Sequence, residues 1–137
     1  MAKLVFTNAY VLLNAVDLSD HVESITLNWT KNDVVVTAMG DLGEQHLPGI
    51  ENNTLTVNFW QDFAANKVDA TLKSILQGGT PVAFKVAATG SSFSSTNPTY
   101  SGSAILLDYQ PLNGKVGDGL QTQVTIPVNG TITYGTA

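Results

Sequence analysis

The sequence contains no cysteine and no arginine, and it has few charged residues of either sign. Without cysteine the chain forms neither a disulfide nor a thiolate metal site. Cysteine usage therefore gives no indication of whether the protein works in an oxidising or a reducing compartment. Its six basic residues, all lysines, face eleven acidic ones, so the formal net charge is −5. Arginine is the preferred partner of phosphates and base edges, and cationic contacts dominate nucleic-acid affinity. The composition therefore argues against a nucleic-acid-binding protein.

Long apolar runs are also missing. No run approaches the roughly 20 residues that a membrane helix needs, and Met1–Leu4 does not begin a signal peptide. We therefore expect a soluble protein made in the cytoplasm, with no membrane partner. Charged residues make up only 12% of the chain, well below the roughly one quarter of typical soluble domains. Thr, Ser, Asn and Gly take the polar positions instead, which suits long strands covered by neighbouring molecules.

With 137 residues, the chain is long enough for one domain, which we place at 1–137. Apolar and polar residues alternate over 54–60 and predict a strand with one buried face. The period then changes and predicts the one substantial helix, over about 66–77. Asn66 is its expected N-cap, and Gly78–Gly79 its end. The residues expected to pack this helix on a sheet are Val68, Leu72, Ile75 and Leu76.

Other segments read as strands: 5–6, 10–13, 22–30, 34–37, 81–87, 100–109 and 120–128. We expect 22–30 and 34–37 to form a hairpin around 31–33, and Asn129–Gly130 to join a second hairpin. Pro127 favours an edge position for its strand. Trp29 and Trp60 are interpreted as core residues on strand faces. The predicted fold class is mainly β, a sandwich or partly closed barrel of antiparallel strands with one flanking α-helix.

The segment 38–53 shows neither the strand nor the helix period, so it reads as a long loop. Loops beyond about 12–15 residues are uncommon in compact domains and are usually functional or disordered. This one is too apolar for a disordered tail. We therefore expect it to dock onto the body of the protein or onto another subunit. The candidate contact residues are Met39, Asp41, Leu42, Glu44, His46, Leu47, Pro48 and Ile50.

Three segments contain residues that could form a site. Asp17, Asp20, His21 and Glu23 lack metal-loop spacing and fit a turn with side-chain hydrogen bonds better. Asp41, Glu44 and His46 lack a nucleophile or a second ligand, so interface contacts are favoured over catalysis. The segment 114–117 lacks the spacing of a phosphate loop. The sequence thus predicts no catalytic, metal or cofactor site, and no enzyme.

Several segments, in this order, resemble tail tube (major tail) proteins of long-tailed, non-contractile bacteriophages, especially those of actinobacterial phages. They span nearly the whole chain; each is an ordinary turn or strand sequence, and the resemblance lies in their combination. The segments are 16–22 (VDLSDHV), 36–41 (VTAMGD), 48–50 (PGI), 61–65 with 68–72, 96–102 (TNPTYSG) and 109–118 (YQPLNGKVGD).

The resemblance implies a virion protein of the tail that assembles into stacked, hexameric rings around a channel for DNA. It implies a long loop that reaches the adjacent ring, and contacts with the tape measure, tail terminator and tail tip proteins. A channel lined by acidic subunits would let the duplex pass without specific binding. Two alternatives stay open: a capsid decoration or other virion surface protein, and a monomeric ligand-binding β-sandwich.

Overall fold

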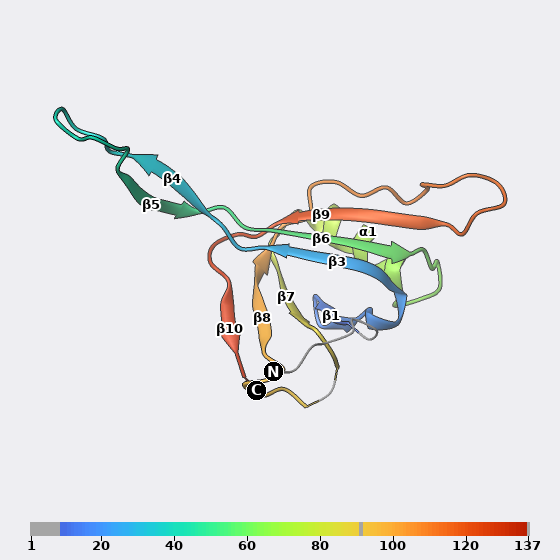
Figure 1. Cartoon of the computed structure of the whole chain (residues 1–137). Coiled ribbons are helices and arrows are strands. Elements are labelled where there is room, and N and C mark those ends of the chain that lie inside the picture. Colours follow the sequence, from blue (N-terminus) through green and yellow to red (C-terminus); the bar gives the residue numbers. More distant parts are fainter. Residues whose placement is uncertain (1–8, 91, 137) are drawn as a thin grey trace.

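The computed structural model describes residues 9–90 and 92–136, and it places two antiparallel sheets face to face (Figure 1). The predicted strand at 5–6 lies outside these residues. A two-stranded arm projects from one end of the sandwich. The mainly β fold class is confirmed, with one α-helix among the described residues and without closure of the sheets into a barrel.

Each sheet is antiparallel throughout. The five-stranded sheet has the order β10 (Thr133–Gly135), β8 (Thr99–Ala104), β7 (Val82–Ala87), β1 (Tyr10–Leu13) and β2 (Val16–Asp17). The three-stranded sheet has the order β3 (Val22–Asn28), β6 (Thr54–Trp60) and β9 (Gln121–Pro127). The arm consists of β4 (Lys31–Val35) and β5 (His46–Glu51), and a 3-10 turn covers Ser19–His21.

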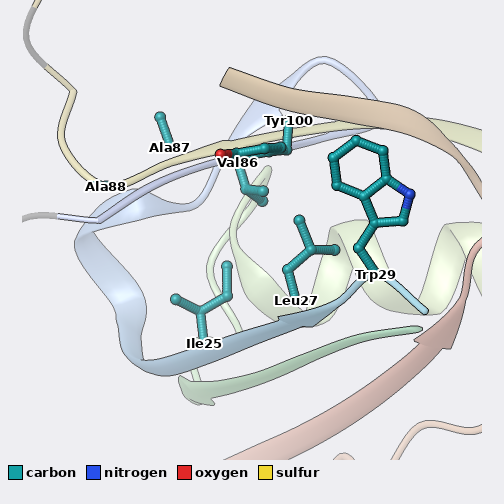
Figure 2. A pocket seen from close by; sticks show the side chains of 7 residues that line it. All are labelled: Ile25, Leu27, Trp29, Val86, Ala87, Ala88 and Tyr100. Atoms are coloured by element: carbon teal, nitrogen blue, oxygen red, sulfur yellow. The ribbon is translucent and has the colours of Figure 1, made fainter. Parts of the chain in front are cut away.

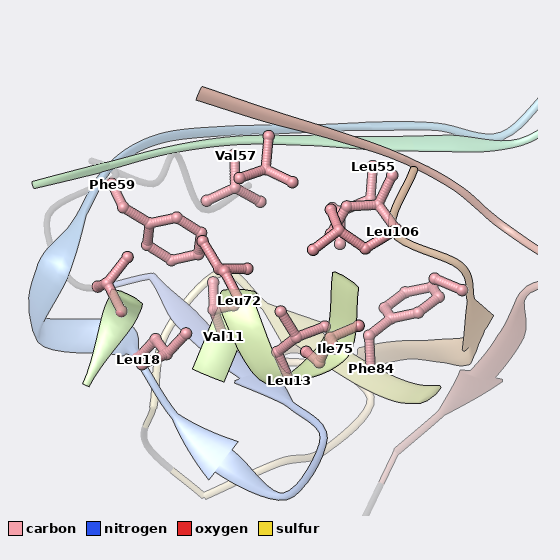
Figure 3. Packing of buried hydrophobic residues seen from close by; sticks show 14 of the residues in the cluster. Val11, Leu13, Leu18, Leu55, Val57, Phe59, Leu72, Ile75, Phe84 and Leu106 are labelled. Atoms are coloured by element: carbon pink, nitrogen blue, oxygen red, sulfur yellow. The ribbon is translucent and has the colours of Figure 1, made fainter. Parts of the chain in front are cut away.

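The core lies between the two sheets. From β6, the alternating residues Leu55, Val57 and Phe59 point inward and are at most 1% exposed. They meet Leu13 and Phe84 of the opposite sheet in one apolar cluster (Figure 3). The period of two along β6 thus sets one buried face, as the sequence predicted.

Helix α1 (Val68–Gly78) inserts its apolar stripe into this cluster (Figure 3). Val68, Leu72 and Ile75 are buried, whereas Leu76 is 36% exposed and Thr71 is buried instead. With about 100° of rotation per residue, the buried face is centred on the Thr71 side of the stripe, and Leu76 falls at its rim.

The C-terminal end of α1 lies at the predicted glycines, but its N-terminal end does not have the predicted N-cap. The helix is preceded by Lys67 without a side-chain cap, and Asn66 has a φ of 61°. Gly79 adopts the left-handed conformation, with a φ of 67°, and its N–H donates to the Ile75 carbonyl at 3.2 Å. A residue without Cβ takes this conformation at little cost, which explains the stop.

The expected hairpin of 22–30 with 34–37 is wrong. Strand β3 pairs with β6, and β4 pairs with β5. The two ladders follow each other along the same two chain segments, so 22–60 forms one long antiparallel hairpin with its tip at 36–45. The expected turn 31–33 is the start of β4. The expected loop 38–53 therefore contains the whole of β5, which was hidden because this strand has no buried face.

The expected hairpin at Asn129–Gly130 is also wrong. Gly130 has a φ of 110° and makes a turn, but the strands it joins lie in different sheets. Strand β10 pairs with β8, so the turn carries the chain from the three-stranded to the five-stranded sheet. Strand β8 ends at Ala104, earlier than the expected 109. Pro127 does lie in an edge strand, because β9 is the last strand of its sheet.

Candidate assembly surfaces

The arm exposes apolar side chains far from the core. All five residues of β4 are exposed, including Val34 and Val35. At the tip, Met39 and Leu42 are fully exposed, at 104% and 106%. On β5, Leu47 is 55% and Ile50 79% exposed, and Pro48 is also exposed. Exposed apolar side chains thus occur on both strands and at the tip of the arm, and large exposed apolar patches are typical of interaction sites.

Polar residues of the arm bond within the arm. His46 Nδ1 lies 2.7 Å from Asp33 Oδ1 on the facing strand, and its Nε2 lies 3.3 Å from Glu44 Oε2. Asp41 Oδ2 accepts a hydrogen bond from the Ala38 N–H at 2.8 Å and closes the tip turn. These predicted site residues thus hold the shape of the arm, and the apolar residues are left to face outward.

Glu51 fixes the arm to the body. Its Oε1 accepts hydrogen bonds from Trp29 Nε1 at 2.5 Å and Asn53 Nδ2 at 3.1 Å, and its Oε2 accepts one from Thr131 Oγ1 at 2.6 Å. These bonds, that from Thr131 most, hold the pKa of Glu51 below its ordinary value. Asn53, only 3% exposed, also accepts from the Thr30 N–H at 3.0 Å. The root of the arm is therefore held on both of its strands.

A second exposed apolar surface lies at the other end of the three-stranded sheet, in the loop 105–120 (Figure 1). Leu107, Leu112 and Val116 are 66%, 77% and 105% exposed. The loop surrounds a hollow of about 590 Å³. We call this hollow the loop hollow; its lining residues are Leu112, Asn113, Gly114, Lys115, Val116, Asp118 and Leu120.

The loop is tied to the body by Gln61 and Tyr109. Gln61 donates its N–H to the Leu120 carbonyl at 2.9 Å and its Nε2 to the Pro111 carbonyl at 2.8 Å. Tyr109 donates its hydroxyl to Asp69 Oδ1 at 2.8 Å and accepts from Gln61 Nε2 at 2.9 Å. Burial raises the pKa of Tyr109 to about 12, so the hydroxyl stays a donor at neutral pH.

The outward-facing cross-strand rows of the three-stranded sheet carry uncharged side chains. These rows are Ser24–Asn58–Gln123, Thr26–Thr56–Thr125 and Asn28–Thr54–Pro127, with Trp60–Gln121 at the end near the loop. Some of these side chains bond to each other, as Asn58 Nδ2 does to Ser24 Oγ at 2.8 Å. Glu23, beside a β-bulge, is the one charged residue of the three strands. We call this surface the neutral face.

An apolar groove of about 410 Å³ opens between β3 and the five-stranded sheet (Figure 2). Ile25, Leu27 and Trp29 line one wall, and Tyr100 lies opposite, its ring centroid 6.3 Å from that of Trp29. Trp29 is 49% exposed here, and Trp60 is 42% exposed on the neutral face. The prediction that both are core residues is therefore wrong, since Trp29 lies on the open side of the sandwich.

The remaining polar residues of the predicted sets form turns or link neighbouring segments by hydrogen bonds. Ser19 donates its N–H to Asp17 Oδ1 at 2.9 Å, as in a side-chain-closed turn. His21 lies between Asp20 and Asp62, at 2.7 and 2.8 Å. The hydrogen bond with His21 lowers the pKa of Asp20, and the hydrogen bonds from the Ala64 N–H and from His21 lower the pKa of Asp62. Within 9–90 and 92–136, no three His, Asp or Glu side chains gather in a group able to hold a metal ion.

At the other predicted turn, the Asp118 N–H donates to the Lys115 carbonyl at 3.1 Å, and Gly117 between them has a φ of 98°. The segment 114–117 is thus a turn inside the loop 105–120. In the part of the chain that the structure describes, no helix is long and apolar enough to cross a membrane.

No family model and no curated protein matches the chain. Solved structures do. The SPP1 tail tube has a TM-score of 0.78 at 11% identity, aligned over 98% of this chain and 80% of that one. A chain of the virion of the native gene transfer agent (GTA) particle has a TM-score of 0.76 at 12% identity, over 96% and 98%. A chain of the tail of the empty GTA particle, solved with C6 symmetry, has a TM-score of 0.67 at 14% identity, over 85% and 83%.

The protein therefore has the fold of virion tail tube subunits, as the sequence resemblance implied. The apolar content of 38–53 indicated a possible contact segment, but the sequence did not indicate that this segment contains strand β5. It also gave no sign of the groove or of the loop hollow. Trp60 in register with outward polar residues was the one local signal for an aromatic on the neutral face.

Proposed function

We propose that the protein is a structural, non-enzymatic subunit of a phage tail tube. Copies of the chain assemble into stacked rings around a channel, and six copies per ring are supported by the C6 symmetry of the GTA tail that shares this fold. The observation that carries the proposal is the arm, which projects exposed apolar residues from a body with the tail tube fold. A monomer would leave this surface in water.

The sheet edges support assembly as well. Strands β3 and β9 are the two edges of the three-stranded sheet, with seven residues each. Exposed edges invite pairing with another chain, and proteins that stay monomeric commonly block them with lysine. Neither β3 nor β9 contains a lysine. Glu23, with the β-bulge in β3, and Pro127 in β9 lie at the ends of their strands, so 25–28 and 121–126 carry no charged residue and no proline. Contacts between copies along these edges would remove them from solvent within a ring.

The neutral face is the surface we assign to the channel. A phosphate backbone binds through lysine and arginine, with release of counterions, and this face offers neither. Hydroxyl and amide side chains would keep the channel wall hydrated without binding the phosphates of the duplex. The channel we propose is thus lined by neutral polar groups rather than by the acidic residues expected from the net charge. Other tail proteins, at the ends and inside the tube, are further proposed partners.

The arm is tested by polar substitution at its tip. In Met39→Ser/Leu42→Ser, both changes lie where the side chains are fully exposed, so the free energy of unfolding should change by less than about 0.5 kcal/mol. We expect a folded subunit that no longer forms tubes in negative-stain electron microscopy. The matched control, Met39→Leu/Leu42→Met, keeps the tip apolar and should form tubes. Normal tubes from the serine variant would remove the arm from assembly.

A further inference from the structure

We propose that Leu107 of one copy docks in the groove beside Trp29 of the next copy in the same ring. This inference rests on the proposed tube function and names the side-chain contact that joins two neighbours within a ring. The groove is the apolar one between β3 and the five-stranded sheet (Figure 2).

The groove is an open side of the sandwich. Its lining residues are aliphatic or aromatic, and none of them carries a charge. Trp29 is 49% exposed here, and the rings of Trp29 and Tyr100 lie 6.3 Å apart across the groove. An apolar side chain from another molecule would be removed from water in this groove, together with the lining that it covers.

The opposite side of the sandwich is closed by the chain itself, because the segment 105–110 runs along β9 (Figure 1). The Ile105 N–H donates to the Pro127 carbonyl at 3.2 Å, and Thr122 Oγ1 donates to the Gln110 carbonyl at 2.8 Å. The two chains advance by the same number of residues between these bonds. The segment is therefore as extended as the strand that it follows.

Within this segment, two successive leucines have opposite environments. Leu106 is 3% exposed and belongs to the apolar cluster, whereas Leu107 is 66% exposed. Successive side chains of an extended chain point to opposite sides. Leu107 therefore points away from the core on the β9 side of the sandwich, where no part of its own copy buries it.

The groove and Leu107 lie at the same level of the three-stranded sheet, at its two opposite edges. Leu27, in the wall of the groove, pairs with Leu55, and Leu55 pairs with Ile126. Ile126 lies within 122–127, the stretch of β9 that the extended segment follows. Three strands about 4.8 Å apart and the buried core separate the two surfaces within one copy. A contact between them therefore joins different copies.

This placement favours Leu107 over two other exposed apolar surfaces as the occupant. The arm lies beyond one end of the three-stranded sheet, and Leu112 and Val116 lie in the later part of the loop 105–120, towards the other end (Figure 1). Leu107 lies beside the middle of the sheet. When two copies stand side by side without an offset along the strands, the residue at this level meets the groove.

The contact has the symmetry that a ring requires. It joins two different surfaces of identical copies, and such a head-to-tail contact closes when the rotations from copy to copy complete a turn. Each neighbour is displaced across the strands, from the β3 edge of one copy to the β9 edge of the next. The contact therefore lies next to the edge contacts proposed above and keeps the neutral faces of all copies on one side.

Polar substitution of Leu107 tests the contact. Leu107→Asp changes an exposed side chain, so we expect it to unfold at the same urea concentration as wild type. We also expect a loss of rings and tubes in negative-stain electron microscopy, because a carboxylate would have to be buried in an uncharged groove. The matched control, Leu107→Met, keeps an apolar side chain and should form tubes.

A disulfide test identifies the partner surface, because the protein has no cysteine of its own. In Leu107→Cys/Ala88→Cys, one thiol replaces Leu107 and the other lies in the groove lining. After oxidation of the tubes, a denaturing gel without reductant should show covalent chains up to six copies and none longer, since each ring closes on itself. The control Val116→Cys/Ala88→Cys, with its first thiol in the later part of the loop, should stay monomeric on the gel.

The outcomes separate this inference from the proposed function. Normal tubes from Leu107→Asp, or tubes of Leu107→Cys/Ala88→Cys without covalent products, would overturn the inference and leave the tube function standing. Covalent chains longer than six copies would also overturn it, since the contact would then join different rings. If the cysteine pair does not assemble, the comparison of Leu107→Asp with Leu107→Met decides. Wild-type protein that forms no rings or tubes would instead count against the proposed function itself.

Discussion

Glu51 is the residue that connects the root of the arm to the body. Its carboxylate receives hydrogen bonds from Trp29 just after β3, Asn53 before β6 and Thr131 after β9. Three separate parts of the chain thus meet at one side chain where the arm leaves the body. Because these donors favour the ionised form, the strength of this connection depends on pH.

The pH dependence has a definite sign. The pKa of Glu51 in the folded protein lies below its ordinary value of 4.5. The stabilisation is therefore fully present above the unfolded pKa and is lost as the pH falls through the folded pKa. Glu51→Gln removes the titration. We expect the difference in unfolding free energy between wild type and variant to be constant from about pH 7 to about pH 5, and to shrink below about pH 4.

Urea denaturation of both proteins across this range measures that difference. The control Asp108→Asn changes an exposed carboxylate in the same way and should give a difference that does not follow this profile. A difference for Glu51→Gln that stays the same down to pH 3 would contradict the role given to the Glu51 hydrogen bonds.

At the scale of elements, helix α1 is the clearest case of a local pattern that sets packing. Leu72 is fully buried and touches the apolar cluster from the side of the helix, whereas Leu76 is 36% exposed. Both residues belong to the same predicted stripe. Their burial differs because the body covers the Thr71 side of the helix.

This difference predicts unequal costs of truncation. Leu72→Ala should lower the free energy of unfolding by about 2–5 kcal/mol, because it removes a buried side chain and leaves a cavity. Leu76→Ala should cost less than about 1 kcal/mol. Chemical denaturation of the two variants beside wild type measures both values. Equal costs would mean that the helix packs with a different face toward the core.

The elements that could be predicted are those with one buried face. Strand β6 and helix α1 have a clear period because alternate residues of β6 and residues three or four apart in α1 enter the core, and Gly79 ends the helix by its backbone conformation. The arm could not be predicted as a pair of strands because both faces of β4 are exposed, so its sequence shows no alternation of apolar and polar residues. The pairing of β3 with β6 was missed because the partner lies 26 residues along the chain, from Asn28 to Thr54, and no local pattern fixes such a distance.

For the assembly surfaces, composition indicated a candidate segment but not its geometry. The apolar content of 38–53 predicted a docking segment, and Met39 and Leu42 are indeed uncovered. The loop hollow is lined by residues of the single segment 112–120, which shows no strand or helix period, whereas the groove beside Trp29 is made by residues brought together from three separate parts of the chain. The groove depends on the packing of two sheets, which a single sequence does not show.

At the scale of the whole molecule, charge is kept away from one face. Within the described residues, the charged side chains lie on the arm, around α1, in the loop 105–120, on β2, β7 and the 3-10 turn, and at Glu23 near the start of β3, while the cross-strand rows of the neutral face have hydroxyl and amide groups. In a tube with this face inside, its side chains contact only what passes through the channel.

Cysteine labelling of assembled tubes tests this placement. Thr125→Cys puts a thiol on the neutral face, and Ser74→Cys puts one on α1; both positions are exposed in the subunit. We expect Thr125→Cys in tubes to react with a small maleimide but to be protected from a maleimide carried on a large dextran. Ser74→Cys should react with both. Reaction of Thr125→Cys with the dextran reagent along the whole tube, or with neither reagent, would place the neutral face elsewhere.

The most direct test of the central claim is negative-stain electron microscopy of the concentrated wild-type protein, with light scattering on the same sample. We predict hollow tubes or stacked rings with six-fold end views, and a scattering mass of many subunits. A sample that stays monomeric at all concentrations, both alone and after addition of a tail-tip complex to template growth, would contradict the account.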